Sequence, residues 1–369
     1  MFGTGRGESL VIHLGAGAWG VVDVCRDPST NDPVPLSYLD QIAVDPSHVV
    51  FLLATHWHDD HIDGLAETLT ACRHADFAIS AAYTGNEFRA VTLEAQSLDA
   101  SRVEEMIKCF ELLEGRPRHH GVKATANRVL EDKRIWWNDD ETVDLTAIAP
   151  TNLALDRANQ DIAAKLLPIV RRRRALGRIT PNQASIAAIL RTPAGCVLLG
   201  GDVEERNAGD SGWSAIVARQ RDRRRPRSAV IKIPHHGSEN AHHPGQWSEL
   251  LEPRPISIVT PFASSRLPRR GDLQRLHEYS HAVYVSGSGA EEPADVEPRV
   301  RRAATADGVQ ITKTGQLGHV RLRKSMVKEE STWEIETGGA AYCVDTEPFP
   351  QAGTEAAQRS AGRRRGRRN

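Results

Sequence analysis

Short apolar runs, separated by turns rich in glycine and proline, dominate the pattern of hydrophobic and polar positions along the chain. Residues 9–14 and 20–25 are two such runs, and the Gly-rich turn between them predicts a pair of neighbouring strands. The run at 49–54, VVFLLA, has no polar position, which is typical of a strand buried on both faces. Helical spacing follows at 62–71, and 77–81 again has the pattern of a strand. This alternation of strand, loop and helix predicts a layered α/β fold.

The rest of the chain alternates in the same way. Apolar residues recur at helical spacing over 86–115 and 151–176, and Gly115 and Pro117 end the first of these stretches. We expect further strands at 142–149, 185–190, 196–199, 229–233, 256–260 and 282–285, a hairpin of 308–313 with 318–322, and another within 333–345. From residue 350 the chain has little apolar surface to bury, so we expect disorder there.

Composition restricts the class of protein. A chain of 369 residues with 40% hydrophobic and 26% charged residues is an ordinary globular protein with a sizeable core. Its five cysteines include no CxxC pair, which argues against both a disulfide framework and a cysteine zinc knuckle. The N-terminal residues lack the pattern of a signal peptide, and no apolar stretch reaches about 18 residues, so we expect a cytoplasmic protein without a membrane span.

Charge is unevenly distributed, although the net charge is only −1 and creates no overall attraction to polyanions. Basic residues are concentrated in three runs, at 171–174, 221–227 and 363–369. Such runs are usually solvated faces or tails. Three of them in one chain are nevertheless compatible with a polyanionic partner such as nucleic acid.

The stretch ATHWHDDHID, at 54–63, follows directly after the most apolar run. His56, His58, Asp60 and His61 form the pattern HxHxDH, and imidazole and carboxylate ligands suit zinc, manganese or iron. Positions two apart on a loop point the same way, so His56 and His58 can hold one ion while Asp60 and His61 turn toward a second. A polar loop with chance histidines is the alternative. Four ligand-type residues at this spacing favour the metal site.

Two further apolar runs end in residues of the same kind. The segment VLLGGD ends in Asp202, a position for a bridging carboxylate, although Gly-Asp alone is also common in turns. The segment IKIPHHGS places His235 and His236 after a strand, and either imidazole could complete the ligands of the second ion. Because three strands end in ligand-type residues, the sequence predicts one shared site for two divalent cations, Zn²⁺ or Mn²⁺.

These motifs, in this order, resemble those of the metallo-β-lactamase superfamily of metal-dependent hydrolases, and within it the soluble hydrolase domain of ComEC. The segments that carry the resemblance are VVDVC with Asp23, ATHWHDDHIDG, NQAS with Asn182 and Ser185, LLGGDVEE, KIPHHGSEN and PRRGDLQRL. They extend over roughly residues 5–325. The resemblance implies an αββα sandwich, the metallo-β-lactamase fold, with the metals at the edge between two sheets.

The resemblance also implies a ligand set. It assigns His56 and His58 to the first ion, Asp60, His61 and a histidine of the HHGS segment to the second, and Asp202 as the bridge. His235 is favoured over His236 because it is the first histidine after the strand. Asp23 would not bind an ion itself but would orient one of the ligands, as metal-bound imidazoles commonly need. Asn182 and Ser185 either contact the site or only cap the start of a strand.

The chain departs from the superfamily in one ligand. Many members carry another histidine for the first ion, whereas His119 and His120 of this chain lie in a basic loop that no strand enters. No channel segment accompanies the motifs, so a role in DNA import is not implied. We expect a hydrolase domain over 1–325 with a helical insertion at about 86–180, a C-terminal β extension over 326–349, and a basic disordered tail over 350–369.

The expected function is a metal-dependent nuclease or phosphodiesterase that cleaves DNA or RNA, because the ComEC-like motifs and the arginine runs both suit phosphate. Asp60 or Asp202 would orient the attacking water. Whichever of His235 and His236 is not a metal ligand would protonate the leaving group, and with His235 as the favoured ligand this is His236. A partner protein in a multi-protein system is a further expectation.

Two other functions compete with this one. A hydrolase of a small ester, lactone or nucleotide is the main alternative, since the fold serves several chemistries. A scaffold in which the metal only stabilises the fold is disfavoured, because every ligand-type residue of the motif set is present.

Overall fold

The computed structural model describes residues 1–83, 101–116, 126–170, 181–205, 209, 211–223, 225–289, 297–300, 302, 315–327 and 331–344. The expectations for 86–100, for the arginine run at 171–174, for the strand at 308–313 and for the tail from 350 lie outside the described residues. No helix within the described part of the chain is long and apolar enough to cross a membrane.

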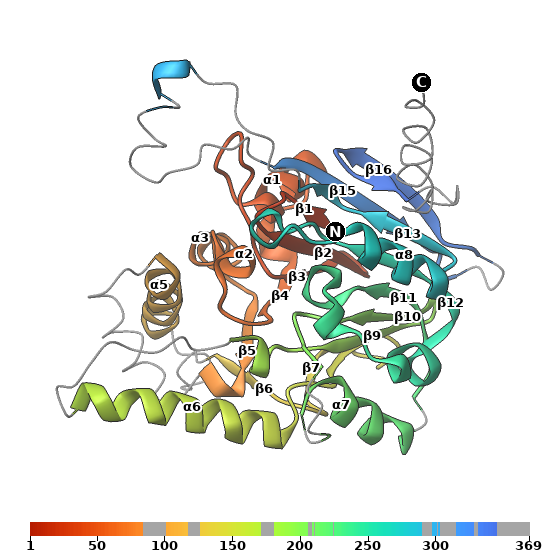
Figure 1. Ribbon diagram of the computed structural model, residues 1–369, viewed down its shortest axis with the longest axis horizontal. Coiled ribbons are helices and arrows are strands. Elements are labelled where there is room, and N and C mark those ends of the chain that lie inside the picture. The colour runs from red at the N-terminus through yellow and green to blue at the C-terminus, as the bar shows by residue number, and fades with distance from the viewer. Residues whose placement is uncertain are drawn as a thin grey trace, which may run out of the picture.

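Two mixed β-sheets pack face to face, and helices cover their outer faces, so the fold is an α/β, αββα sandwich (Figure 1). The first sheet has the order β14-β15-β1-β2-β3-β4-β5-β6, with β16 beside β15. Its strands are β1 (Phe2–Gly3), β2 (Glu8–Gly15), β3 (Ala18–Val22), β4 (Val49–Ala54), β5 (Asp76–Ser80), β6 (Asn127–Val129), β14 (Gly287–Ser288), β15 (Gln316–Arg323) and β16 (Glu334–Gly339).

The second sheet has the order β17-β13-β12-β11-β10-β9-β8-β7. Its strands are β7 (Arg134–Trp137), β8 (Asp144–Ala147), β9 (Ala188–Thr192), β10 (Gly195–Leu199), β11 (Ser228–Lys232), β12 (Leu251–Val259), β13 (Ala282–Val285) and β17 (Tyr342–Cys343). Strands β10 to β13 are parallel, as are β3 to β6 in the first sheet. In each sheet, therefore, the carboxyl ends of several strands lie along one edge.

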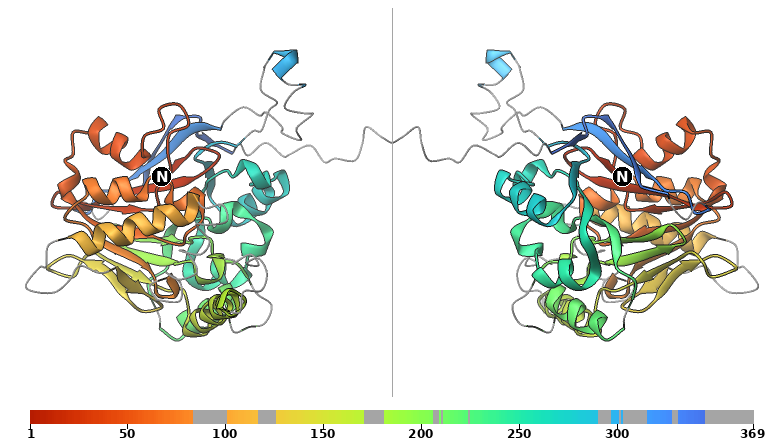
Figure 2. Two further views of the ribbon diagram at one scale, coloured as in Figure 1. Left: turned by 90° about the vertical axis from the view of Figure 1, so that its left-hand side faces the viewer. Right: turned by 90° about the vertical axis from the view of Figure 1, so that its right-hand side faces the viewer.

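Helices complete the outer layers. In the described part of the chain the α-helices include α1 (Val34–Gln41), α2 (Asp59–Ile62), α3 (Leu65–Ala71), α5 (Ser101–Gly115), α6 (Asn152–Val170), α7 (Gly212–Arg221) and α8 (Arg270–Tyr279). Short helical turns are η1 (Pro46–His48), η2 (Ala81–Tyr83), η3 (Pro181–Ala184), η4 (Pro234–Gly237), η5 (Glu239–Ala241), η6 (Gln246–Leu250) and η7 (Ala263–Ser265). Figure 2 shows α1 and α3 (red to orange) and α8 (teal) on opposite sides of the paired sheets.

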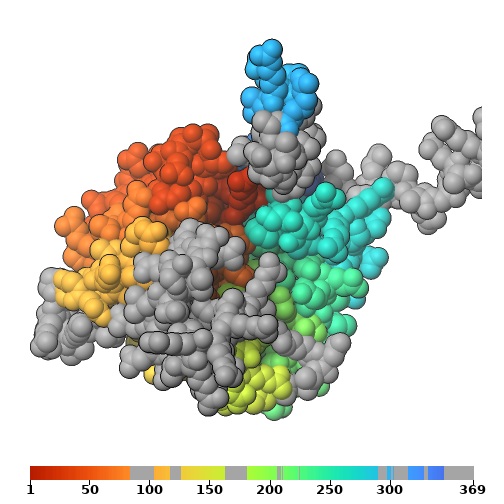
Figure 3. All heavy atoms as spheres, turned by 60° about the vertical axis from the view of Figure 1, so that its left-hand side comes forward, coloured from red at the N-terminus to blue at the C-terminus, as the bar shows by residue number. Residues whose placement is uncertain are grey.

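Three layers of apolar side chains hold the four layers of the fold together. In β4, Phe51 and Leu53 pack between the two sheets, whereas Leu52 and Ala54 pack under the helices of the first sheet. The second sheet packs its outer face against α7 and α8, with Trp213 fully buried there. The prediction that 49–54 is a strand buried on both faces is therefore confirmed. In the space-filling view of Figure 3, the surface of residues 1–83 (red to orange) adjoins that of residues around 200–290 (green to cyan).

Several expected elements differ from the structure. The stretch 62–71 is not one helix: Ile62 ends α2 and Leu65 begins α3, because Gly64 between them has a φ of +95°. The stretch 86–180, expected as a helical insertion, also contains β6, β7 and β8, which belong to the two sheets. The stretch 333–345 forms no hairpin. Its strand β16 pairs with β15 and its strand β17 with β13, so this C-terminal segment adds one strand to each sheet.

Candidate metal centre

The ligand-type residues of the three motifs come together where strands of both sheets end. Strand β4 leads into the HxHxDH loop and α2, β10 leads through two glycines to Asp202, and β11 leads into η4 with its two histidines. Because these strands run parallel to their neighbours, the segments that follow them meet at one edge between the sheets.

Four buried side chains form what we call the central group: Asp60, His61, Asp202 and His236. One ligand atom of each lies within 4.8 Å of the ligand atoms of the others. His236 Nε2 is 3.0 Å from Asp60 Oδ2 and 3.6 Å from Asp202 Oδ2. His61 Nε2 is 3.4 Å from Asp60 Oδ2 and 3.5 Å from Asp202 Oδ1. A single cation can therefore contact all four residues.

His56 and His58 form a second pair of candidate ligands beside the central group. His56 Nε2 lies 3.1 Å from His58 Nδ1 and 3.9 Å from Asp202 Oδ2. His56 is fully buried, whereas His58 is partly exposed. Asp202 thus borders both the histidine pair and the central group, which is the placement that a bridging carboxylate requires.

The two histidines of the HHGS segment lie in different surroundings. The sequence favours His235 as the ligand, but the structure places His236 in the central group. Both residues have left-handed backbone, with φ values of +47° and +52°, so η4 turns sharply and returns the second imidazole to the sheet edge. His235 Nδ1 lies 3.4 Å from Glu204 Oε1, and its side chain is 20% exposed. His235 therefore lies at the rim of the site.

Asp23 fixes His61 from behind. Its carboxylate accepts hydrogen bonds from the Thr55 amide at 2.7 Å, the Thr55 hydroxyl at 2.8 Å and His61 Nδ1 at 2.8 Å. Because a carboxylate only accepts, His61 Nδ1 carries a proton, and Nε2 is the nitrogen that faces Asp60 and Asp202. His61 Nε2 is buried and has no hydrogen-bond partner among the residues that the structure describes. An orphaned imidazole nitrogen that faces two carboxylates fits a metal ligand.

Ser185 and Asn182 have separate places. Ser185 Oγ accepts the amide hydrogen of Asp202 at 2.9 Å, so it lies beneath the loop that carries Asp202. Asn182 Nδ2 donates to Glu204 Oε1 at 3.0 Å and lies 3.4 Å from His235 Nε2, at the rim. The loop before Asp202 also requires glycine at 201, where φ is +52° and a Cβ would lie 2.3 Å from Ile186 O.

Two buried residues of the site were not among those that the sequence singles out. Lys232, at the end of β11, lies with Nζ 2.5 Å from Glu8 Oε1 and 3.5 Å from Asp202 Oδ1. Both Lys232 and Glu8 are almost completely buried. A lysine inside an otherwise apolar strand was the feature that could have revealed them.

The charges of the site do not balance within the described protein. Four buried carboxylates, those of Glu8, Asp23, Asp60 and Asp202, surround one buried ammonium, that of Lys232, so neutral histidines would leave three negative charges in excess. Uncompensated buried charge is costly. Protons on the histidines or carboxyl groups, or bound cations, can compensate it, and the donor set suits divalent metals.

The pKa values of the site follow this imbalance. Burial disfavours the imidazolium form of His61, but Asp202, Asp60 and Asp23 outweigh burial and raise the pKa of His61 well above its usual value. Burial also raises the pKa of Asp60, but His61 and His236 outweigh it and hold the pKa of Asp60 well below its usual range. The pKa of His56 lies well below its usual value because burial and the nearby His61 both lower it.

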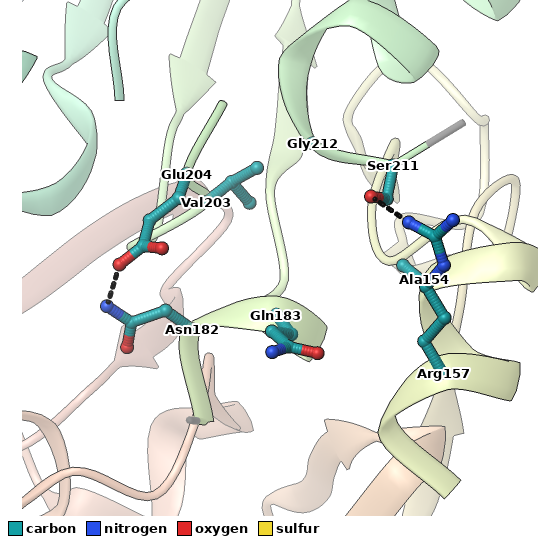
Figure 4. A pocket seen from close by; sticks show the side chains of 8 residues that line it. All are labelled: Ala154, Arg157, Asn182, Gln183, Val203, Glu204, Ser211 and Gly212. Atoms are coloured by element: carbon teal, nitrogen blue, oxygen red, sulfur yellow. Dashed lines mark hydrogen bonds between the residues drawn. The ribbon is translucent and has the colours of Figure 1, made fainter. Parts of the chain in front are cut away.

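A small cavity adjoins the rim (Figure 4). It has a volume of about 10 Å³, room for about one water molecule. Asn182 and Glu204 line one side, and Arg157, which donates to Ser211 Oγ at 2.9 Å, lines the other. Polar groups of α6 and of the segment after Asp202 therefore extend the site beyond the central group.

Comparisons with known proteins gave structural neighbours only. No protein-family model matches the sequence, and no curated protein matches it. Among solved structures, the MIM-2 metallo-β-lactamase is 14% identical over 64% of this chain and 72% of its own, with a TM-score of 0.35. The class B3 di-zinc metallo-β-lactamase LRA-12, from an Alaskan soil metagenome, is 11% identical over 76% of this chain and 91% of its own, with a TM-score of 0.33. The subclass B3 enzyme MEM-A1, from a soil metagenome library, is 11% identical over 75% and 86%, with a TM-score of 0.32. Identities this low transfer neither activity nor residue roles, so the site is interpreted from its own geometry.

Proposed function

We propose that this protein is a metal-dependent hydrolase of the metallo-β-lactamase type, with a dinuclear centre at the edge between its two sheets. The observation that carries the proposal is the central group, in which four buried ligand-type residues converge and His61 Nε2 finds no hydrogen-bond partner in the described part of the chain. The excess of buried carboxylates over the single ammonium of Lys232 supports the same conclusion, because divalent cations would compensate the negative charge.

The proposed ligands follow the geometry rather than the order of residues in the motif. His56 and His58 would hold the first ion, Asp60, His61 and His236 the second, and Asp202 would bridge them. Bound there, Zn²⁺ or Mn²⁺ would activate a water molecule as the nucleophile and polarise the bond under attack. No third histidine for the first ion is found among the described residues around His56, and residues 117–125 with His119 and His120 lie outside them.

Residues of the chain itself would orient the reaction. Asp60 and Asp202 present carboxylate oxygens to the same space and can accept a hydrogen bond from the attacking water. His235 lies at the partly exposed rim, between Glu204 and Asn182, where it can donate a hydrogen bond to the leaving group. Asp23 keeps the His61 ring in the orientation that points Nε2 at the centre.

For the substrate, we propose a phosphodiester of DNA or RNA, on the strength of the ComEC-like motif set. The basic run at 221–227 gives less support than its sequence suggests. Arg221 pairs with Glu249 at 3.1 Å, and Arg223 and Arg225 both pair with Asp132. Since these guanidinium groups already have acidic partners, a small ester, lactone or nucleotide remains the second candidate.

Metal content and hydrolysis can be measured on the same preparations. The purified protein would be analysed for bound ions by mass spectrometry, then assayed in Mn²⁺, Zn²⁺ or EDTA on single- and double-stranded DNA and RNA, a chromogenic phosphodiester, and a panel of esters and lactones. We expect two ions per chain and cleavage of nucleic acid that EDTA abolishes.

A matched pair of variants tests the ligand assignment. We expect His236→Asn to lose one ion and to lower kcat by at least about a hundredfold, because a ligand of the second ion is removed. We expect His235→Asn, one residue away, to keep both ions and to lose less activity. Two bound ions in His236→Asn would contradict the assignment. Hydrolysis of a small ester or lactone, without cleavage of nucleic acid, would support the proposed hydrolase class but contradict the proposed phosphodiester substrate.

A further inference from the structure

A second acidic group lies directly behind the central group and shares His61 with it. Glu8, Asp23 and His61 also bring ligand atoms within 4.8 Å of one another, and all three are buried. His61 Nδ1 is 2.8 Å from Asp23 Oδ2 and 3.6 Å from Glu8 Oε1. The ammonium of Lys232 lies 2.5 Å from the same Glu8 oxygen, so this group already has a cation of its own.

Lys232 also contacts the loop that carries the bridging carboxylate. Its Nζ donates to Gly201 O at 2.9 Å and lies 3.5 Å from Asp202 Oδ1. One ammonium therefore holds both the backbone before Asp202 and the carboxylate itself. The ammonium attracts Oδ1 of Asp202, while Oδ2 of the same carboxylate faces His56 and His236.

The other oxygen of Glu8 acts on His236 through Thr260. The Thr260 hydroxyl donates its only hydrogen to Glu8 Oε2, so its oxygen remains an acceptor. His236 Nδ1 lies 3.2 Å from that hydroxyl oxygen and 3.2 Å from the carbonyl oxygen of Thr260. Only acceptors face Nδ1, so it carries a proton. Nε2 lies 3.0 Å from Asp60 Oδ2 and 3.6 Å from Asp202 Oδ2, so it is the nitrogen that would exchange its proton for an ion.

We propose that Lys232 and Glu8 act as a positioning pair, which sets the orientation of Asp202 directly and of His236 through Thr260 before any ion binds. This inference rests on the proposed dinuclear function, because it assigns the pair to two of the proposed ligands. Glu8 begins β2 of the first sheet, whereas Lys232 ends β11 of the second sheet, and Asp202 and Thr260 follow its strands β10 and β12. The pair therefore holds Asp202 and His236, which follow strands of the second sheet, in position relative to the histidines that follow β4 of the first sheet.

A purely structural role would also explain a buried ion pair between two sheets, so the test needs a control pair elsewhere. Arg219 and Glu131 provide it. Arg219 Nη1 lies 2.6 Å from Glu131 Oε1, and the Glu131 side chain is buried. The variant Glu131→Gln removes the charge of a buried acid without touching the proposed centre.

The experiment uses Co²⁺, whose visible absorption reports ligand geometry. Wild type, Lys232→Met, Lys232→Arg, Glu8→Gln and Glu131→Gln would each be titrated with Co²⁺ against a chromophoric chelator, and each metal-free protein would be unfolded thermally. We expect Lys232→Met to bind Co²⁺ at least about tenfold more weakly, with an altered spectrum. Glu8→Gln should shift both readouts in the same direction, Lys232→Arg should restore part of the affinity, and Glu131→Gln should change stability alone.

Unchanged Co²⁺ affinity and spectrum in Lys232→Met and Glu8→Gln, with a loss of stability like that of Glu131→Gln, would overturn the inference. If Lys232→Met does not fold, Glu8→Gln carries the test by itself, because it preserves shape and an acceptor for Thr260. Failure of wild type to bind Co²⁺ would instead refute the proposed function. The two failures are therefore distinguishable.

Discussion

His61 is the residue at which the two acidic groups of the site meet. Its Nδ1 donates to Asp23, and its Nε2 faces Asp60 and Asp202. An imidazole held this way cannot exchange its tautomer without breaking a 2.8 Å hydrogen bond to a buried carboxylate. The ring is therefore oriented by the protein rather than by the ion that it would bind.

His242, a histidine outside the site, gives a pH-dependent prediction. Its Nδ1 accepts the indole N–H of Trp247 at 3.2 Å, and burial, with Arg275 nearby, lowers the pKa of His242 from its usual 6.5 to about 4. Between these values the unfolded chain binds a proton that the folded protein does not, so the free energy of unfolding falls as pH falls from 6.5 toward 4. Because His242 is partly exposed, we expect about 1–2 kcal/mol from this residue.

Urea unfolding of wild type and His242→Gln at pH 4.5 and pH 7 would measure the effect. We expect the difference in stability between the two pH values to shrink by that amount in the variant. His281→Gln, which changes an exposed histidine, serves as the control. An equal pH dependence in wild type and His242→Gln would contradict the prediction.

Which residues could be found from sequence depends on whether they share a local pattern. His56, His58, Asp60 and His61 lie within six positions, so their spacing alone indicated a site. Glu8 and Lys232 are single charged residues in strands more than 200 positions apart, and only folding brings them together. The choice between His235 and His236 depended on two left-handed backbone conformations, which adjacent identical residues do not reveal.

At the scale of elements, the turn after β10 decides where Asp202 lies. Gly201 has a φ of +52°, and an added Cβ would lie 2.3 Å from Ile186 O and 2.7 Å from Ser185 Oγ, the atom that accepts the Asp202 amide hydrogen. We expect Gly201→Ala to lower the free energy of unfolding by about 2–4 kcal/mol and to reduce metal binding.

Chemical denaturation with measurement of bound metal would test this. Gly115→Ala is the matched control, because no atom of the described residues lies within 4 Å of the added Cβ at the end of α5 and φ is not positive there. That variant should be neutral or up to about 1 kcal/mol more stable. A Gly201→Ala protein as stable as wild type, with full metal content, would show that the turn tolerates a side chain.

Strands with a long apolar run were predictable and very short ones were not. The run at 49–54 is β4 because every position can be buried, whichever face it occupies. Strands such as β1, β6 and β17 have two or three residues, too few to show any period. Their pairing is decided by the neighbouring strand, and so the division of the C-terminal segment between two sheets could not be derived from local sequence.

At the scale of the whole molecule, the site joins the two sheets, because Asp60 and His61 follow a strand of the first and Asp202 and His236 follow strands of the second. Cations bound between them would favour the folded state. We expect chelation to lower the free energy of unfolding by about 4 kcal/mol when the free ion is in about 1,000-fold excess over its Kd.

Denaturant unfolding with EDTA, or with saturating Zn²⁺ or Mn²⁺, measures this difference. Asp202→Asn, which weakens the proposed bridge, should reduce the gain in stability from metal. Equal stability with and without EDTA, while analysis shows that the ions have been removed, would rule out the coupling between metal binding and the packing of the sheets.

The route of the chain through the first sheet has a consequence for its synthesis. Strand β1 pairs with both β2 and β15, and Glu8 meets Thr260, 252 positions later. A nascent chain can therefore build the contact behind His236 only after Thr260, and the pairing of β1 with β15 only after Gln316–Arg323, has left the ribosome. Contacts so distant in sequence are slow to form. We expect catalytic competence to arise late, as one of the last steps of folding, so that truncated or stalled chains remain inert.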